Sequence, residues 1–257
     1  MRIPAIGSRA MSDYNRQHKA RFDPQSYELT TFGTTRGGET ISERELSDIF
    51  LFLSPNSTIL EVGTGPGRIT RRMAEELGAS IVGTDVDPEM VKHLATQIRK
   101  TKNPAERAID LVVANGQDLP FKAGVFDMVV CVRVIRYVDR PRKAIADMVS
   151  SIKRGGGMVI EFANILRPQS LTQLRQYLLH QEAYPRLFRK REVEGIVTGV
   201  GMRIVIIQGW HKIPPKIVAS INNAMVVRFL VRLEEILQKI LPVELMSRSI
   251  VVYAVKD

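Results

Sequence analysis

The sequence lacks the features that mark secreted, disulfide-bonded and membrane-spanning proteins. It holds a single cysteine, Cys131, so no internal disulfide can form, which favours a reducing compartment. No apolar run approaches the roughly 20 residues of a membrane-spanning helix. The first residues contain no continuous apolar segment of the kind found in secretory signals. These absences predict a cytoplasmic protein with no transmembrane segment, and we predict no metal site.

Acidic residues are also scarce relative to basic ones. The chain has 37 lysines and arginines against 27 acidic residues, a formal net charge of +10. Basic residues gather at positions 2–21 and 167–191. A clustered basic face attracts nucleic acid or anionic lipid, whereas dispersed positive charge acts only on solubility. The charge alone leaves both readings open.

Internal repeats and low-complexity tracts are absent, and short β-branched runs alternate with helical patterns. A chain of 257 residues can bury one sizeable core. We predict strands at 58–62, 80–84, 111–114, 128–132, 158–162 and 250–255. We predict helices at 42–52, 69–77, 88–99, 142–152 and 226–241, with residues 154–157 (RGGG) as a turn. This alternation predicts an α/β fold, a parallel sheet with helices on both faces.

Glycine is concentrated in one stretch, EVGTGPGRIT at residues 61–70, between a predicted strand and a predicted helix. Such a loop lies at the carboxyl end of its strand, where open α/β sheets bind ligands. The missing side chains let a ligand approach the backbone, and the helix start favours an anionic group. The third glycine comes one residue earlier than in G-x-G-x-x-G, which argues against a nicotinamide or flavin enzyme. A tight turn without a ligand is the alternative.

Several motifs together resemble the class I S-adenosylmethionine-dependent methyltransferases. ILEVGTGPGRIT resembles their first motif, IVGTDVDPEMV their second-strand motif, and ANGQDLPF their adenine-site segment. FDMVVCVRVIRYV and IKRGGGMVIEFAN resemble the fourth and fifth strand segments, so the resemblance spans residues 58–164. It implies a Rossmann-like, mostly parallel seven-stranded sheet with helical insertions. It also implies S-adenosylmethionine as the cofactor.

The resemblance also implies a set of cofactor-binding residues: Glu61, Gly63, Gly65, Gly67, Asp85, Val86, Asn115, Gly116 and Cys131. The glycines would lie against the methionine and ribose, Glu61 would meet the amino group, and Asp85 would accept from the ribose hydroxyls. Asn115 replaces an aspartate common in the family, yet its carbonyl can still accept from the adenine amino group. Gly116 would supply a backbone N–H. We predict Asp87, rather than Asp85, as the cap of the following helix.

The segment after the fourth predicted strand departs from the family. Cys131 lies near the expected methionine end of the cofactor, or is simply a small buried residue. Arg133 and Arg136 could bind an acceptor carboxylate or phenolate, or could lie on a solvated helix start. The sequence does not rank the candidates for a general base, which are Tyr27, Tyr137, Glu161, His180 and His211.

The chain is predicted to have two parts. Residues 1–55 would form a helical cap, and residues 56–257 a methyltransferase domain with lid-like insertions near 165–190 and 210–247. In the predicted helix 226–241 an apolar stripe packs on the core or, alternatively, forms a lid or contacts a membrane surface: Phe229, Leu230, Leu233, Ile236, Leu237 and Ile240. The predicted acceptor is a small or lipid-like molecule carrying an anionic group. RNA methylation and non-catalytic cofactor binding are the alternatives.

Overall fold

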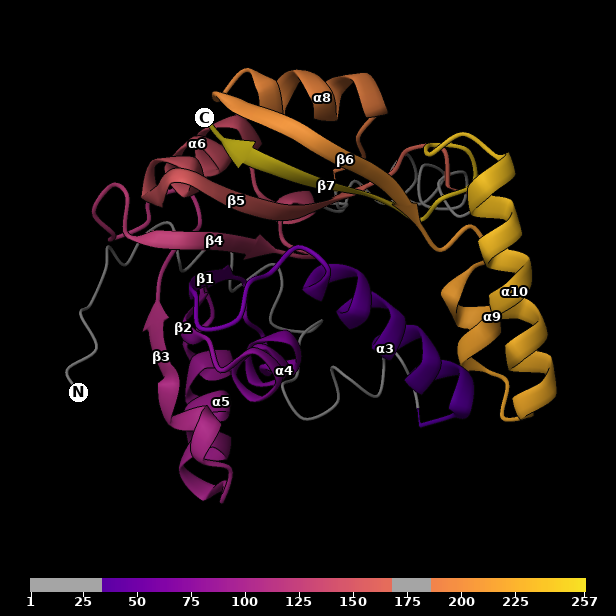
Figure 1. Ribbon diagram of the computed structural model, residues 1–257, viewed down its shortest axis with the longest axis horizontal. Coiled ribbons are helices and arrows are strands. Elements are labelled where there is room, and N and C mark those ends of the chain that lie inside the picture. Colours follow the sequence, from indigo (N-terminus) through magenta and orange to yellow (C-terminus); the bar gives the residue numbers. More distant parts are fainter. Residues whose placement is uncertain (1–33, 168–185) are drawn as a thin grey trace, which may run out of the picture.

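The computed structural model describes residues 34–167 and 186–257 (Figure 1). Most of the proposed insertion at 165–190, most of the proposed N-terminal cap, and the candidate bases Tyr27 and His180 lie outside the described residues. The statements below concern the described parts of the chain.

The described residues form one sheet with strand order β3-β2-β1-β4-β5-β7-β6. Its seven strands are β1 (Thr58–Val62), β2 (Ser80–Asp85), β3 (Ile109–Val113), β4 (Phe126–Cys131), β5 (Ile152–Ala163), β6 (Met202–Trp210) and β7 (Ser249–Lys256). The α-helices are α3 (Arg36–Phe50), α4 (Arg68–Leu77), α5 (Pro88–Lys100), α6 (Pro141–Ser151), α8 (Lys190–Thr198), α9 (Pro215–Ala219) and α10 (Ala224–Ile240). Two short 3₁₀ helices, η1 (Pro104–Ala108) and η2 (Ile135–Tyr137), lie in the connections.

The sheet is parallel except around β7. Strands β1 to β5 pair in parallel, and β7 runs antiparallel to both β5 and β6. The carboxyl ends of β1 to β6 and the start of β7 therefore meet along one edge, which we call the carboxyl edge. The predicted α/β architecture is confirmed, and this edge is where ligands bind in such sheets.

Helices cover both faces of the sheet (Figure 1). On one face, α6 and α8 pack on β1, β4, β5 and β7 through side chains that include Met148, Val193 and Ile160. On the other, α3 and α4 pack on β1 and β2 through Leu46, Met73 and Ile81. α9 and α10 lie beside α3 at one end of the molecule (Figure 1). Burial of both faces explains why the strands are nearly continuous apolar runs.

Two predicted boundaries are wrong by more than two residues, and both lie next to glycines. α3 begins at Arg36 rather than Ser42, with Thr35 accepting from the Gly38 N–H at 3.1 Å as its cap. The first turn of α3 contains two glycines, and because glycine is a poor helix former the sequence did not indicate a helix there. A Cβ on Gly37 would lie 1.8 Å from the Val218 carbonyl oxygen, so α9 requires glycine there. The predicted RGGG turn is instead a bulged part of β5, which begins at Ile152.

The apolar stripe of α10 is only partly buried. Leu230, Leu233 and Leu237 are partly buried, and Leu230 packs against Ile41 and Val218. Phe229, Ile236 and Ile240 stay exposed, so the prediction that the stripe packs on the core is wrong for these three residues. Among residues 34–167 and 186–257, no helix has the length and apolar character needed to cross a bilayer.

Candidate functional site

The glycine loop, residues 63–67, joins β1 to α4 at the carboxyl edge, and its three glycines serve different purposes. A Cβ on Gly63 would lie 2.0 Å from a methyl of Val134, and one on Gly67 would lie 2.3 Å from a methyl of Leu94. These two glycines are required by the protein's own packing. A Cβ on Gly65 would meet no atom within 4 Å. Gly65 is therefore the position where another molecule can approach the backbone.

Asp85, the last residue of β2, faces the glycine loop. Its Oδ2 accepts from the Gly65 N–H at 2.8 Å, and its Oδ1 accepts from the Asp87 N–H at 2.9 Å. Burial raises the pKa of Asp85 to about 6, against the opposing effect of these hydrogen bonds. Asp87 accepts from the Glu89 N–H at 3.0 Å and caps α5, as predicted. Asp85 is thus left beside the open position at Gly65.

Glu61 is buried within β1, directly before the glycine loop. Its carboxyl group accepts from the hydroxyl of Thr70, and from that of Thr64 at 3.5 Å. Burial raises the pKa of Glu61 to about 8, although both threonines oppose the shift. The effect of burial thus exceeds that of the threonines and of the Arg68 charge, so the carboxyl group is protonated more readily than a free glutamate.

The predicted adenine segment forms a turn after β3, tied to the end of β2. The Ala114 N–H donates to the Asp85 carbonyl at 2.9 Å. Asn115 accepts from the Gln117 N–H at 3.0 Å, so its side-chain carbonyl already takes part in its own turn. A Cβ on Gly116 would lie 3.1 Å from a methyl of Val62, so a larger residue there would have to push this side chain aside by a few tenths of an ångström. Val86, half-buried, completes the group around the β2 end.

Cys131 ends β4 with its side chain in the core beneath α6 and α8. Burial raises the pKa of its thiol, and the carboxyl groups of Glu161 and Glu61 raise it further. The thiol is fully buried, in agreement with the alternative of a small core residue. Only its backbone remains to contribute to a ligand site.

The other half of the carboxyl edge holds a network of buried ion pairs. Glu161 of β5 accepts from the guanidinium of Arg136, from the Ser249 hydroxyl, and from the Arg133 backbone N–H at 2.9 Å. Burial would raise the pKa of Glu161, but Arg136 and its other partners hold it below the usual range. Arg133 has a φ of +64°, rare for a residue with a side chain. Its contact with Glu161 supports this conformation.

Glu45 of α3 connects the network, because it binds two arginines and a histidine from three other parts of the chain. It pairs with Arg68 at 2.9 Å, with Arg133, and with His211 Nε2 at 2.8 Å. Burial opposes ionisation of Glu45, but Arg133, the hydrogen bond from His211 and Arg68 hold its pKa well below the usual range. We call Glu45, Arg68, Arg133, Arg136, Glu161 and His211 the ion-pair network.

This network changes the interpretation of Arg133 and Arg136, which were predicted from the sequence to bind an anionic group of the acceptor. Both hold carboxylates of the protein itself, and Arg136 is buried, so it does not lie on a solvated helix start. Arg248 lies close by and has no hydrogen bond or ion pair from its side chain to any described residue. Burial, then Arg133 and Arg136, lower the pKa of Arg248 to about 10. Sequence spacing gave no signal for Glu45 or Arg248.

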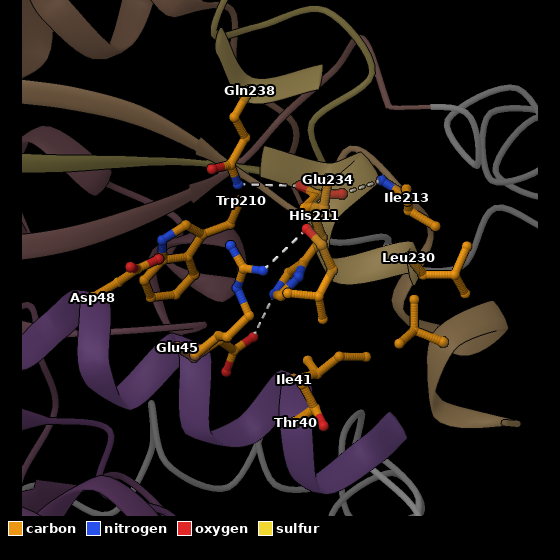
Figure 2. Close-up of a pocket in the computed structure, with 13 residues that line it drawn as sticks. Thr40, Ile41, Glu45, Asp48, Trp210, His211, Ile213, Leu230, Glu234 and Gln238 are labelled. Atoms are coloured by element: carbon orange, nitrogen blue, oxygen red, sulfur yellow. Dashed lines mark hydrogen bonds and ion pairs between the residues drawn. The ribbon is translucent and has the colours of Figure 1, made fainter. Parts of the chain in front are cut away.

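A small pocket opens beside the network, between α3, the end of β6 and α10 (Figure 2). Figure 2 shows His211 turned toward Glu45, with Asp48 beside the indole of Trp210. Burial raises the pKa of Asp48 against the charge of Arg44. Glu234 closes the far side and accepts from the backbone N–H groups of Lys212 and Ile213 at 2.8 and 2.7 Å. Of the candidate bases in the described residues, only His211 lines this pocket.

Comparisons with known proteins agree with this fold. Residues 60–160 match the family model of a methyltransferase domain. The chain is 34% identical over 113 residues to the ubiquinone/menaquinone biosynthesis C-methyltransferase UbiE of Rhizobium meliloti, covering 43% of each chain. It is 27% identical over 150 residues to norajmaline N-methyltransferase of Rauvolfia serpentina, covering 56% of this chain and 49% of that one. The matches span less than half the length of these curated relatives.

A solved structure extends the likeness to nearly the whole chain. An S-adenosylmethionine-dependent methyltransferase from Thermotoga maritima superposes with a TM-score of 0.64, covering 95% of this chain and 99% of that one. The sequence identity is only 16%, so this likeness shows a shared fold.

Proposed function

Because this chain contains a class I S-adenosylmethionine-dependent methyltransferase domain, we propose that it transfers a methyl group from S-adenosylmethionine to a small or lipid-like acceptor. The observation that carries the proposal is the open position at Gly65, with the carboxylate of Asp85 bound to its N–H at 2.8 Å. The protein's own packing does not need this glycine, and it lies at the edge where such sheets bind ligands.

The residues present fit the proposed cofactor. Asp85 offers carboxylate lone pairs to hydroxyl donors such as those of a ribose. Glu61 is a buried carboxyl group whose pKa of about 8 is raised by burial, and a cationic amino group nearby would favour its ionised form. Asn115 keeps its amide NH₂ and one carbonyl lone pair for a base. We propose Glu61, Gly65, Asp85, Val86, Asn115 and Gly116 as the cofactor side of the site.

When bound, S-adenosylmethionine supplies a methyl group already activated for transfer. The protein's task is then chiefly to bind and align, since correct orientation supplies much of the rate. The backbone at Gly65 leaves room for the ligand, while Asp85 fixes its orientation. His211 is the candidate to take a proton from an acceptor, because Glu45 holds its Nε2 and leaves Nδ1 for another partner. This role is needed only for acceptors that lose a proton.

Two kinds of acceptor deserve direct comparison. The curated relatives named above methylate carbon in ubiquinone/menaquinone biosynthesis and nitrogen in norajmaline, which supports a small-molecule acceptor. The net charge of +10 supports RNA as the second candidate.

Calorimetry tests the cofactor. S-adenosylmethionine and S-adenosylhomocysteine are expected to bind, and NAD is expected not to bind. Binding of NAD in competition with S-adenosylmethionine, or no binding of S-adenosylmethionine, would overturn the proposal.

Methyl transfer from labelled S-adenosylmethionine to a metabolite and lipid extract, and in parallel to total RNA, tests the acceptor. RNA binding through many phosphate contacts falls about 10³–10⁵-fold between 50 and 200 mM salt. Steeply salt-dependent RNA binding together with labelled RNA would replace the small-molecule proposal. Label in the extract alone would support it.

A further inference from the structure

The outward face of α10 carries a row of exposed apolar side chains. Met225 and Ile240 are each 71% exposed, Phe229 is 64% exposed, and Ile236 is 52% exposed. Successive members are four, seven and four residues apart, so they lie in one stripe along the helix. We call these four residues the outer stripe. A row of exposed apolar side chains along one helix is typical of a surface that binds another molecule.

The opposite face of α10 is fixed to the protein, so the outer stripe cannot turn inward. Val227 and Glu234 are buried, and Leu230 packs with Ile41 and Val218 of α3 and α9. Glu234 accepts two backbone N–H bonds from the segment after β6. Asn223 caps the helix by accepting from the Met225 N–H at 2.9 Å. α10 therefore presents one defined face at the outer edge of the molecule (Figure 1).

A row of cations borders the outer stripe. Arg228, Arg232 and Lys239 are exposed and are spaced four and seven residues apart, so they form a parallel ridge. None of the three has an ion pair with a residue that the structure describes. Glu235, on the same side, is paired with Arg44 at 3.5 Å. The ridge thus offers three positive charges beside an apolar surface.

We propose that the outward face of α10 binds the surface of an anionic lipid bilayer. A helix with apolar side chains on one side and arginine or lysine along the border lies in the membrane interface, with its apolar side chains among the acyl chains. The cations meet anionic headgroups, each contributing to attraction within about one Debye length. The net charge of +10 strengthens the same attraction. This surface is separate from the cofactor side of the site and does not depend on the proposed methyl transfer.

Vesicle sedimentation of the full chain tests the proposal. Vesicles of phosphatidylcholine alone are compared with vesicles that contain about one third phosphatidylglycerol, a fraction high enough to give a strongly negative surface. The protein is expected to bind the anionic vesicles at least about tenfold more tightly. The double variant Phe229→Ser, Ile240→Ser is expected to lose about 100-fold in affinity, because both side chains lose their apolar burial. Arg228→Gln and Arg232→Gln are each expected to lose about fivefold.

Leu51→Ser is the matched control. Leu51 is 76% exposed at the end of α3, outside α10, so its replacement removes a similar apolar side chain from a different surface. It is expected to leave vesicle binding unchanged. Thermal unfolding of every variant checks the fold, and exposed positions should change it little.

Three results would overturn the proposal. The first is equal binding to the two kinds of vesicle, and the second is equal loss from Leu51→Ser and from the double variant. The third is concentration-dependent self-association, seen by sedimentation velocity, that the double variant abolishes while wild-type protein ignores vesicles. That result would assign the face to a second copy of the chain.

Discussion

The two halves of the carboxyl edge are built in opposite ways. Around β1 and β2, the glycine loop is held by hydrogen bonds from backbone N–H groups. The residues that form these bonds lie within 25 positions of one another, from Glu61 to Asp85. Around β4 to β7, the side chains of the ion-pair network converge from positions as distant as Glu45 and His211. The first half is open at Gly65, whereas the second is filled by charges that neutralise one another. A motif of neighbouring residues can thus leave open space for a ligand. A network of residues from remote positions instead holds helices and strands together.

The largest expected effect lies in the distributed half. Arg136→Gln leaves the buried carboxylate of Glu161 without its main cation, so the free energy of unfolding should fall by about 3–5 kcal/mol. Urea unfolding of the wild-type protein and the variant measures this difference in the free energy of unfolding. Arg248→Gln is the control, because Arg248 has no described partner and its removal relieves repulsion from Arg133 and Arg136. It should leave stability unchanged or raise it. Equal losses in both variants would show that the network is not held by specific pairs.

The next effect concerns the vacancy in the local half. Gly65→Val places a branched side chain in the open position, so affinity for S-adenosylmethionine should fall by at least about 100-fold in calorimetry. Gly124→Val is the control, because Gly124 also has a positive φ (+68°, against +53° at Gly65) and open space around it. Both variants carry a similar strain of about 1–3 kcal/mol. If the Gly65 variant folds and binds normally, the loop is only a turn.

A smaller effect separates two neighbouring carboxylates. Asp85→Asn keeps the shape but loses the charge, so cofactor affinity should fall by about 10- to 100-fold. Asp87→Asn should change affinity little, since asparagine also caps helices well. Calorimetry on the two variants gives the answer. A larger loss from the Asp87 variant would reverse the assigned roles.

The smallest expected effect is a pH dependence. The pKa of Asp85 is raised by burial to about 6, and the ionised form accepts hydrogen bonds better from hydroxyl donors. Affinity for S-adenosylmethionine should therefore fall as pH falls through 6, by roughly tenfold between pH 7 and pH 5. Asp85→Asn should make this fall in affinity less steep, and the remainder is expected from Glu61, whose raised pKa makes it a second group that must ionise. An unchanged slope in the variant would show that Asp85 does not contribute to the pH dependence.

The local half could be predicted from sequence because its signals are local. The strand, the glycines and Asp85 lie in continuous motifs, and the structure confirms the loop, the strand β2 and the cap at Asp87. Their individual roles in binding stay predictions. The sequence did not reveal that Gly63 packs against Val134 and Gly67 against Leu94, because no motif spacing links these residues.

The distributed half could not be predicted because its partners come from remote positions. The residues next to Arg133 and Arg136 in the sequence include no carboxylate that would indicate their ion pairs. Their carboxylates, Glu45 and Glu161, are 88 and 25 residues away. Glu45 lies inside the helix predicted at 42–52, but no spacing in the sequence shows which remote residues its side chain meets. For α10, the sequence shows the helix and its apolar residues but cannot say which side the rest of the chain covers.

The position of β7 has a consequence for how the sheet is completed during synthesis. β7 comes after β6 in the chain but lies between β5 and β6, and in the described residues β6 pairs with no other strand. Until residues 249–256 leave the ribosome, β6 remains without a partner and the apolar edge of β5 is uncovered. A translational pause or a premature stop between these strands would therefore expose two aggregation-prone edges at once. Chaperone dependence of the nascent chain should be concentrated in that interval.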